Sequence, residues 1–504
     1  MYDAIVIGAG NGGLVAALTL QKAHKKVLLL ESGGTPGGFA TSFVRGRFEF
    51  DASLQGLNGY SVSDDSEIKK LFERLGIQEK LDFVELSDDC VITLNTHESY
   101  LIPHSLSSFL LKMEEYVPGC QESIQVFFDI CKEVTVALKY IDENSSDLEE
   151  LLEKECPRFL EFSTNSLEEV FEKLKIAKKI REILTSFWIT YGSPSRDFAF
   201  VSFAPLFCSY LQSVAYPVKR SFALSLTLQE EFERCGGEIC FFTKVEKILF
   251  QDEQISGVQV EDGSIFYTKH VISNISPNML YATLLPKDKL TKEMNQICNA
   301  RTLGGRGFAV YLGLNQSPQK LGLTEARYFI YDSLDSNLEA KRMRELYHTG
   351  CVVTVYENMV KQSSFVTTVC ITSLLFSDDF DKIVTSSNYF ALKEKIAKHF
   401  VKVLEQATKT SIQDAIEEIE VATPVTFARY GGHPSGVIHG YLAKGYDNLL
   451  PRLLNRQREQ SIPHLHFCGG FGPRLSGFSA SYMSGEEAAI LTLQDMAEEG
   501  DMYV

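Results

Sequence analysis

Apolar and polar positions follow a simple order over the first thirty residues. Residues 4–7 (AIVI) and 27–30 (VLLL) are continuous apolar runs, and residues 14–24 between them place apolar side chains on one helical face. Short runs without polar interruption are typical of strands that are buried on both faces of a parallel sheet. The pattern therefore predicts a β-α-β unit and, with it, a protein of the α/β class.

The rest of the chain continues with both periodicities. Helical spacing over 109–140, 148–184 and 390–407 predicts helices, whereas the patterns over 306–314, 328–331 and 364–374 are typical of strands. The sequence contains neither an internal repeat nor a low-complexity tract. These strands and their covering helices predict a second, α+β unit beside the β-α-β unit.

A glycine-rich turn, GAGNGG at residues 8–13, separates the first strand from its helix. Gly8 permits a tight turn, Gly10 lets the backbone approach a pyrophosphate, and Gly13 allows close packing of the helix on the strand. The helix N-terminus offers free N–H groups to that phosphate. Glu31 ends the second strand, where its carboxylate can accept hydrogen bonds from ribose hydroxyls. FAD or NAD is therefore expected before NADP.

Three further blocks resemble the phytoene desaturase-like and retinol saturase-like flavoproteins, a family that includes carotenoid isomerases. The first block is SGGTPGGFAT at 32–41 with RFEFDA at 47–52. The second runs from Tyr-Pro at 216–217 through TKVEKI at 243–248 to VISN at 271–274. The third is IPHLHFCGG at 462–470 with GFSASYMSG at 477–485. The resemblance implies FAD as the cofactor and a fold of the amine oxidase and phytoene desaturase type.

The resemblance also implies roles for single residues. The glycine pair at 37–38 would lie against FAD, residues 52–55 would approach the flavin, and Val245 would pack on the adenine side. Backbone N–H groups near 479 would face the flavin and stabilise its reduced, negative form. With the glycine turn, the expected cofactor-binding residues are Gly8, Gly10, Asn11, Gly12, Gly13, Glu31, Ser32, Gly37, Gly38, Phe39, Ala40, Val245, Gly469, Gly470, Ser479, Ala480 and Met483.

The chain departs from the family's pattern at three points. It has SLQ at 53–55 where the family commonly has Gly-Pro-Thr, and Ser479-Ala480 where the family often has Pro and Gly. The glycine-rich step that follows Tyr-Pro in the family is VKRS here, at 218–221.

The positions of the blocks predict the domain organisation. Residues 1–90, 216–285 and 420–504 would form one discontinuous, Rossmann-like FAD-binding domain. Residues 91–215 and 286–419 would form an inserted α+β substrate-binding domain. A chain of 504 residues is long enough for both domains.

Composition and charge limit the partners. A net charge of −17 leaves no basic surface for phosphates, so binding of nucleic acid is not expected. The eleven cysteines are scattered singly, with no CxxC pair and no His/Cys cluster at zinc spacing. No metal site is therefore expected, and a reducing cytosol suits the chain. Because the β-α-β unit begins near residue 2, a leader peptide is not expected and the location is expected to be cytoplasmic.

Residues 183–218 form an unusual stretch in which Arg196 and Asp197 are the only charges. The length would admit a membrane span, but Pro205 and Pro217 argue against one. Two interpretations remain open. The stretch is a plain buried core, or it is a tunnel or lid for a hydrophobic small-molecule substrate, with peripheral membrane contact through 183–218.

Catalytic residues are harder to predict, because the flavin exchanges hydride with the substrate directly. The protein mainly orients the flavin and the substrate and excludes water. The candidates are His433 for proton exchange, Tyr482 for contact with the ring or substrate, and Arg429 for a substrate head group. Each has a structural alternative, namely a hydrogen-bonded histidine in a glycine turn, a packed aromatic ring and an ordinary ion pair.

Three functional hypotheses follow. The first is FAD-dependent hydride transfer at a carbon–carbon bond of an unsaturated lipid (carotenoid, retinoid or fatty-acid-like), by desaturation, saturation or cis/trans isomerisation. The second is an amine-oxidase-like flavoenzyme that oxidises a C–N bond. The third is a lipid-binding escort protein of the same fold, a group that loses the cofactor-binding residues that this chain keeps. No second strand–GxGxxG–helix unit follows, so the electron donor or acceptor is open.

Overall fold

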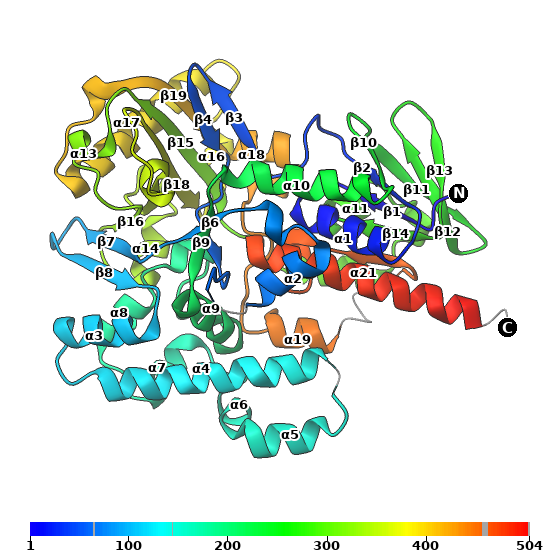
Figure 1. Ribbon diagram of the computed structural model, residues 1–504, viewed down its shortest axis with the longest axis horizontal. Coiled ribbons are helices and arrows are strands. Elements are labelled where there is room, and N and C mark those ends of the chain that lie inside the picture. The colour runs from blue at the N-terminus through cyan, green and yellow to red at the C-terminus, as the bar shows by residue number, and fades with distance from the viewer. Residues whose placement is uncertain (64–65, 144, 456–461, 502–504) are drawn as a thin grey trace.

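A five-stranded parallel sheet forms the centre of one half of the molecule (Figure 1). The structure is a computed structural model that describes residues 1–63, 66–143, 145–455 and 462–501. In spatial order the strands are β10 (Glu238–Cys240), β2 (Val27–Leu30), β1 (Ala4–Ile7), β14 (His270–Ser273) and β20 (Leu465–Phe467). Strands from the beginning, middle and end of the chain therefore pair in one sheet, as the discontinuous arrangement requires.

Both faces of this sheet are covered, which explains its continuous apolar strands. Ala4 and Val6 of β1 pack in the core beneath α1 (Asn11–Lys22), whereas Ile5 and Ile7 belong to the core on the other face. On the first face α1 contacts α10 (Arg220–Arg234) and α21 (Phe478–Asp501). The second face carries α11 (Pro277–Thr283) and a small antiparallel sheet of β11 (Val245–Gln251), β12 (Gln254–Val260) and β13 (Ile265–Tyr267).

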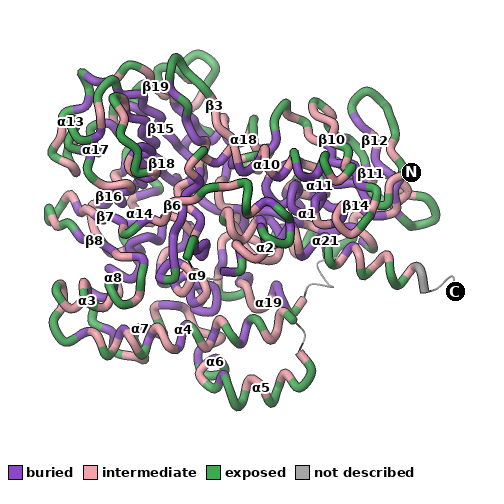
Figure 2. Tube along the Cα trace, in the orientation of Figure 1, coloured by how far each residue is buried: buried purple, intermediate pink, exposed green. Residues whose placement is uncertain are grey.

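A seven-stranded sheet organises the other half. Its strands are, in spatial order, β19 (Ile416–Ala422), β15 (Arg306–Leu314), β18 (Thr367–Leu375), β17 (Cys351–Val355), β16 (Arg327–Tyr331), β7 (Asp88–Thr93) and β8 (Ser99–Pro103). All neighbours are antiparallel except β16 and β7. One face packs on α17 (Tyr389–Thr408). The purple tube of Figure 2 shows that both sheets lie in the interior.

Helices form a layer at the edge of this half, drawn in cyan and green in Figure 1. They are α3 (Leu106–Tyr116), α4 (Gln121–Asp142), α5 (Leu148–Glu155), α6 (Pro157–Phe162), α7 (Leu167–Lys173), α8 (Lys178–Leu184) and α9 (Phe200–Gln212). The remaining strands are β3 (Ser42–Arg45), β4 (Phe48–Asp51), β5 (Leu57–Asn58), β6 (Phe83–Glu85) and β9 (Val214–Pro217). The other α-helices of the described residues are α2 (Glu67–Leu75), α12 (Lys292–Ala300), α13 (Pro318–Leu321), α14 (Ser336–Arg342), α15 (Tyr356–Met359), α16 (Asp379–Ile383), α18 (Pro424–Gly431) and α19 (Leu449–Leu454).

Residues 183–218 fold into the end of α8, a short 3-10 turn, α9 and β9, and their large side chains are buried. Trp188, Phe203 and Phe207 are each at most 1% exposed. This burial argues against the expected membrane contact through 183–218, because none of the three rings faces solvent. Phe203 and Phe207 pack on Phe127 of α4 and on each other, and Trp188 lies against Tyr331 and Phe376. Among the described helices, none is both long and apolar enough to cross a membrane.

Candidate functional site

The glycine turn joins β1 to α1 at the carboxyl edge of the parallel sheet. Gly8 has a φ of +96°, a left-handed conformation that favours glycine, and Gly10 is the N-cap of α1. No side chain among the described residues caps the first turn of α1. Its free N–H groups and the positive end of the helix dipole are therefore available to a pyrophosphate.

Glu31 fastens this turn to the end of β2. Its carboxylate accepts hydrogen bonds from the backbone N–H groups of Ala9, at 2.8 Å, and Gly33, at 2.6 Å. The exposed Ser32 hydroxyl donates to the same carboxylate at 3.3 Å. Glu31 thus shapes the turn itself, a role that the sequence did not predict, and it lies where the ribose of a dinucleotide would follow the pyrophosphate.

The glycine pair at 37–38 lies directly over the turn. The Gly37 N–H donates to the Ala9 carbonyl at 2.7 Å, and a Cβ on Gly38 would lie 3.3 Å from the Cα of Gly10. Both glycines have positive φ, of +102° and +58°. Ser225 of α10 holds the segment from the other side, since its hydroxyl donates to the Ala40 carbonyl at 2.8 Å.

The C-terminal block reaches the same edge of the sheet. β20 ends next to β14, and Gly469 follows with a φ of +79°. A Cβ on Gly477, just before α21, would meet nothing within 4 Å, so the backbone is open there. Ser479 ties the first turn of α21 to β5 by donating to the Asn58 carbonyl at 2.8 Å. Ala480 and Met483, in the same two turns, are partly buried.

Asn274, which the sequence analysis missed, lies between the two glycine turns. Its side-chain amide donates to the Gly8 carbonyl at 3.4 Å. A Cβ on Gly10 would lie 2.4 Å from Nδ2 of Asn274, and a Cβ on Gly469 would lie 2.2 Å from its Oδ1. The glycines thus leave room for this amide as well as for a cofactor. The available signal was a polar residue directly after β14, at the sheet edge where parallel strands place ligand-binding groups.

The ribose end is bounded by the β10–β11 connection. The N–H of Thr243 donates to the Glu31 carbonyl at 2.8 Å, and Val245 begins β11 as a buried residue. Phe242 lies between them with a φ of +50° and an 81% exposed ring against Gly34. FAD fits this arrangement part by part, with the pyrophosphate at the uncapped helix, the ribose at the Glu31 carboxylate and the flavin at the open backbone at 477. The arrangement therefore supports FAD as the cofactor.

His433 lies against the cofactor segments. Its ring centroid is 4.6 Å from that of Phe39, which follows the glycine pair, and 5.1 Å from that of Phe471, which follows the terminal glycines. Nδ1 donates to the Val437 carbonyl at 2.9 Å, which leaves Nε2 as the unprotonated nitrogen. Burial lowers the pKa of His433 to about 4, so the imidazole is neutral at pH 7.

The other two catalytic candidates lie differently. Tyr482 is fully buried on α21 with its ring 5.6 Å from that of Phe72, and its hydroxyl has no hydrogen-bond partner among the described residues. Arg429 is exposed at the end of α18, where its guanidinium lies over the ring of Tyr430 at 5.7 Å. The geometry thus brings His433 to the cofactor segments and leaves Arg429 at the surface.

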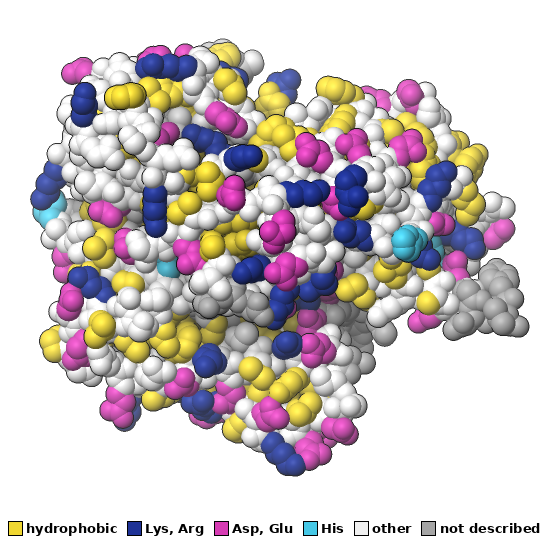
Figure 3. Space-filling view, in the orientation of Figure 1, with side chains coloured by type: hydrophobic (Ala, Val, Ile, Leu, Met, Phe, Trp, Pro, Cys, Tyr) yellow, Lys and Arg dark blue, Asp and Glu magenta, His cyan; other side chains and the backbone are white. Residues whose placement is uncertain are grey.

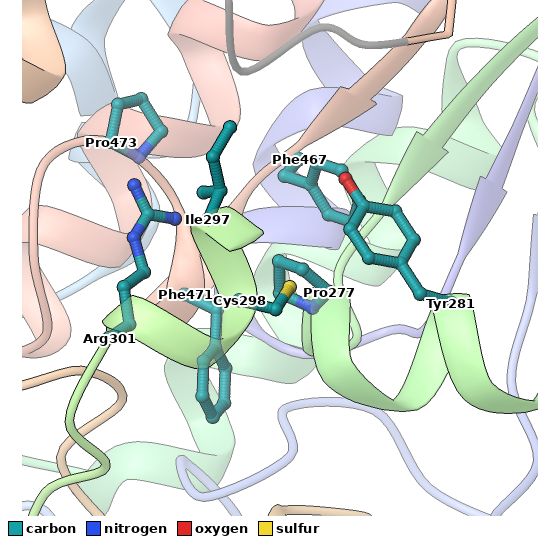
Figure 4. Close-up of a pocket in the computed structure, with 8 residues that line it drawn as sticks. All are labelled: Pro277, Tyr281, Ile297, Cys298, Arg301, Phe467, Phe471 and Pro473. Carbon is teal, nitrogen blue, oxygen red and sulfur yellow. The ribbon is translucent and has the colours of Figure 1, made fainter. Parts of the chain in front are cut away.

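A small cavity adjoins the terminal glycine turn (Figure 4). Tyr281 and Phe467 lie on one side of it, and Arg301 and Pro473 lie on the other. Its volume of about 20 Å³ is enough for one water molecule. This cavity is therefore not a substrate site, and the candidate site consists of the loops at the carboxyl edge of the sheet.

Comparison with known proteins agrees with this geometry. Residues 6–75 match the family model of an NAD(P)-binding Rossmann-like domain. The chain is 26% identical over 477 residues to an all-trans-retinol 13,14-reductase of Danio rerio, which covers 87% of this chain and 77% of that protein. It is 23% identical over 454 residues to a chloroplastic prolycopene isomerase of Daucus carota, which covers 88% of this chain and 72% of that protein.

A solved structure of cyclohexylamine oxidase from Brevibacterium oxydans has the same fold. The TM-score is 0.61 with 14% identity, and the match covers 98% of this chain and 99% of that one. The expected fold class and the expected resemblance are both confirmed. The chain is thus a relative of the retinol 13,14-reductases and prolycopene isomerases, built on the fold of the flavin-dependent amine oxidases.

Proposed function

We propose that this protein is an FAD-dependent oxidoreductase that transfers hydride at a carbon–carbon bond of an unsaturated lipid. The observation that carries the proposal is the convergence of three distant glycine segments, at 8–13, 37–38 and 469–470, on one edge of one sheet. The relatives that match most of the chain are named for action on retinol and prolycopene, which are unsaturated lipids. A hydrophobic polyene is therefore the substrate class.

In this chemistry the protein binds and orients FAD and the substrate, and it excludes water. FAD, when bound, supplies the hydride acceptor or donor. The first turn of α1 would hold the pyrophosphate, with Glu31 at the ribose and Asn274 fixing the backbone of two turns. The packed rings of Phe39, His433 and Phe471 form an apolar wall beside these segments. A neutral His433 keeps Nε2 free to accept a proton from a substrate carbon or to return it.

An amine oxidase is the second candidate, because the cyclohexylamine oxidase structure shares the fold over nearly the whole chain. At 14% identity this likeness concerns the fold alone. Amine oxidation is therefore tested separately in the experiment below. The sequence similarity to a retinol reductase and a prolycopene isomerase favours hydride transfer at a carbon–carbon bond.

The test is anaerobic incubation of the FAD-loaded protein with a panel of polyenes, retinoids, unsaturated fatty acids and primary amines. The flavin spectrum and the product masses are recorded together. A product that differs by two hydrogens demonstrates redox chemistry at the polyene, whereas an unchanged mass with a new retention time demonstrates isomerisation. Reduction of the flavin by amines alone would overturn the proposal. The control is Gly10→Val, whose side chain would collide with Asn274 at the pyrophosphate turn and prevent FAD binding.

A further inference from the structure

Two histidines lie side by side at the amino edge of the parallel sheet, opposite the edge that carries the glycine turns. His270 is the first residue of β14, and His464 directly precedes β20. The two strands are parallel neighbours, and the N–H of Val271 donates to the His464 carbonyl at 2.9 Å. The pairing of two distant segments thus brings the imidazoles together, with ring centroids 4.7 Å apart.

A carboxylate completes the group from the last turns of α21. The helix runs across β14 and β20, and its end lies on the same side of the molecule as the N-terminus (Figure 1). The carboxylate of Glu499 lies 3.4 Å from Nδ1 of His464 and 3.8 Å from Nε2 of His270. In these three residues, one nitrogen or oxygen atom of each side chain lies within 4.8 Å of the other two.

His270 is buried without the hydrogen bonds that a buried imidazole normally forms. Its exposed fraction is 3%, and its Nδ1 has no hydrogen-bond partner among the described residues. The distance of 3.8 Å between Nε2 and the Glu499 carboxylate is too long for a hydrogen bond. Because buried polar groups nearly always have a partner, this ring points to an ion or a water molecule between it and the carboxylate.

A neighbouring pair on the same helix and strand shows a different arrangement. His466 lies two residues beyond His464, and Asp495 lies one turn before Glu499 on α21. Nε2 of His466 is only 2.7 Å from the Asp495 carboxylate, so this pair is joined directly. The helix can therefore approach the strand closely enough for direct contact, and the wider spacing around Glu499 is instead typical of ligands around a cation.

The donor set and its spacing suit Zn²⁺. Two imidazole nitrogens and one carboxylate oxygen are ligands that this ion prefers. Bonds of about 2.0–2.1 Å in a tetrahedron place neighbouring ligand atoms about 3.3 Å apart, close to the two spacings at Glu499. The side chains of His464 and Glu499 are 20% and 19% exposed, so an ion can enter from solvent and a water molecule can take the fourth position.

One positive charge competes with a metal ion at this place. Nζ of Lys269 lies 3.5 Å from the Glu499 carboxylate, and the lysine side chain is 40% exposed. An exposed ion pair of this kind contributes little free energy, and the flexible side chain can move into solvent. Lys269 therefore balances Glu499 in the absence of an ion without blocking its binding.

We propose that His270, His464 and Glu499 form a site for a divalent transition-metal ion, with Zn²⁺ as the expected ion, which fastens the end of α21 to β14 and β20. The sequence analysis expected no metal site, because these ligands come from three distant segments and show no zinc spacing. The inference does not depend on the proposed function, since the site lies at the opposite edge of the sheet. An ion that binds only the folded chain stabilises it.

The test uses FAD-loaded protein without a histidine tag, freed of metal with EDTA and then dialysed. Zn²⁺ is titrated in competition with a fluorescent chelator, and the melting temperature is measured with and without the ion. We expect about one equivalent of bound Zn²⁺ and a rise in melting temperature of about 2–3 °C at a Zn²⁺ concentration a hundred times the Kd. Co²⁺ is the second probe, because its spectrum distinguishes histidine and carboxylate ligands from cysteine thiolates.

Four variants locate the ion. His464→Gln and Glu499→Gln should each weaken Zn²⁺ binding at least about a hundredfold and abolish the rise in melting temperature, since loss of an outer-shell partner alone costs about 10–100-fold. Lys269→Gln removes the competing charge and should tighten binding about two- to fivefold. The matched control is His97→Gln, at an exposed histidine between β7 and β8, which should bind Zn²⁺ as the wild type does.

Three results would overturn the site. They are a wild-type protein that binds no Zn²⁺, an affinity that is unchanged in both His464→Gln and Glu499→Gln, and a thiolate band in the spectrum of the Co²⁺ form. Both replaced side chains are partly exposed, so the variants should fold, and their melting temperatures without metal verify this.

Discussion

Replacing Glu31 tests how the end of β2 builds the cofactor site. The carboxylate accepts from the N–H groups of Ala9 and Gly33 at 2.8 and 2.6 Å, and Glu31→Ala removes both acceptors. Charge-assisted hydrogen bonds contribute about 1.5–3 kcal/mol each, and water replaces part of that at a half-buried site. We therefore expect the free energy of unfolding of the apoprotein to fall by about 2 kcal/mol and the FAD dissociation constant to rise about ten- to hundredfold.

The assay combines urea unfolding of the apoprotein with titration of FAD followed by flavin fluorescence. Glu31→Gln should give an intermediate loss, because the amide oxygen can accept one of the two N–H groups while the NH₂ group opposes the other. Glu172→Ala is the matched control, because this glutamate is exposed on α7, in the other half of the molecule. An FAD affinity that is unchanged in Glu31→Ala would refute the assignment of Glu31 to the cofactor site. A loss of stability without a loss of affinity would restrict Glu31 to shaping the turn.

Three other outcomes are expected. Gly485→Ala should lower stability by about 1–3 kcal/mol, because its Cβ would lie 2.3 Å from a backbone carbonyl of α1, whereas Gly445→Ala, with nothing within 4 Å, should leave the melting temperature unchanged. Phe242→Ala should weaken FAD binding about fivefold if the exposed ring covers the adenine end, and an unchanged titration would contradict that role. Because the pKa of His433 is about 4 in the folded chain, stability should fall as the pH drops from 6.5 to 4, by up to about 3 kcal/mol from this group, and His433→Gln should flatten that fall in a series of thermal melts.

Local patterns were enough to predict most elements near the site. The strand expected at 306–314 has those bounds, and the helix expected at 390–407 runs from Tyr389 to Thr408. The glycine turn and the terminal block lie where the β-α-β interpretation puts them. These predictions succeed because apolar periodicity and glycine spacing are properties of neighbouring residues, which the sequence records directly. Side chains of both charges are interspersed over the face in Figure 3.

The burial of residues 183–218 could not be predicted in the same way. A stretch without charge suits a core and a membrane surface equally, because both environments exclude ions. Only the tertiary structure, in which α9 of this stretch packs on α4 and the large side chains are buried, favours the core. Arg429 and Arg220 show the same limit. The sequence offered Arg429 as a candidate for a substrate head group, with an ordinary ion pair as the alternative, and the fold leaves it exposed. Arg220 carried no prediction, yet it lines a cavity.

The sequence by itself determined the class of fold, the cofactor and the residues of the phosphate-binding turn, because each depends on short-range spacing along the chain. The tertiary structure decided which groups share the space that the glycines leave free. Asn274 lies 266 positions from Gly8, and the cavity at Arg220 joins residues that are more than a hundred positions apart. Such contacts depend on how sheets and helices pack, and no local pattern encodes them.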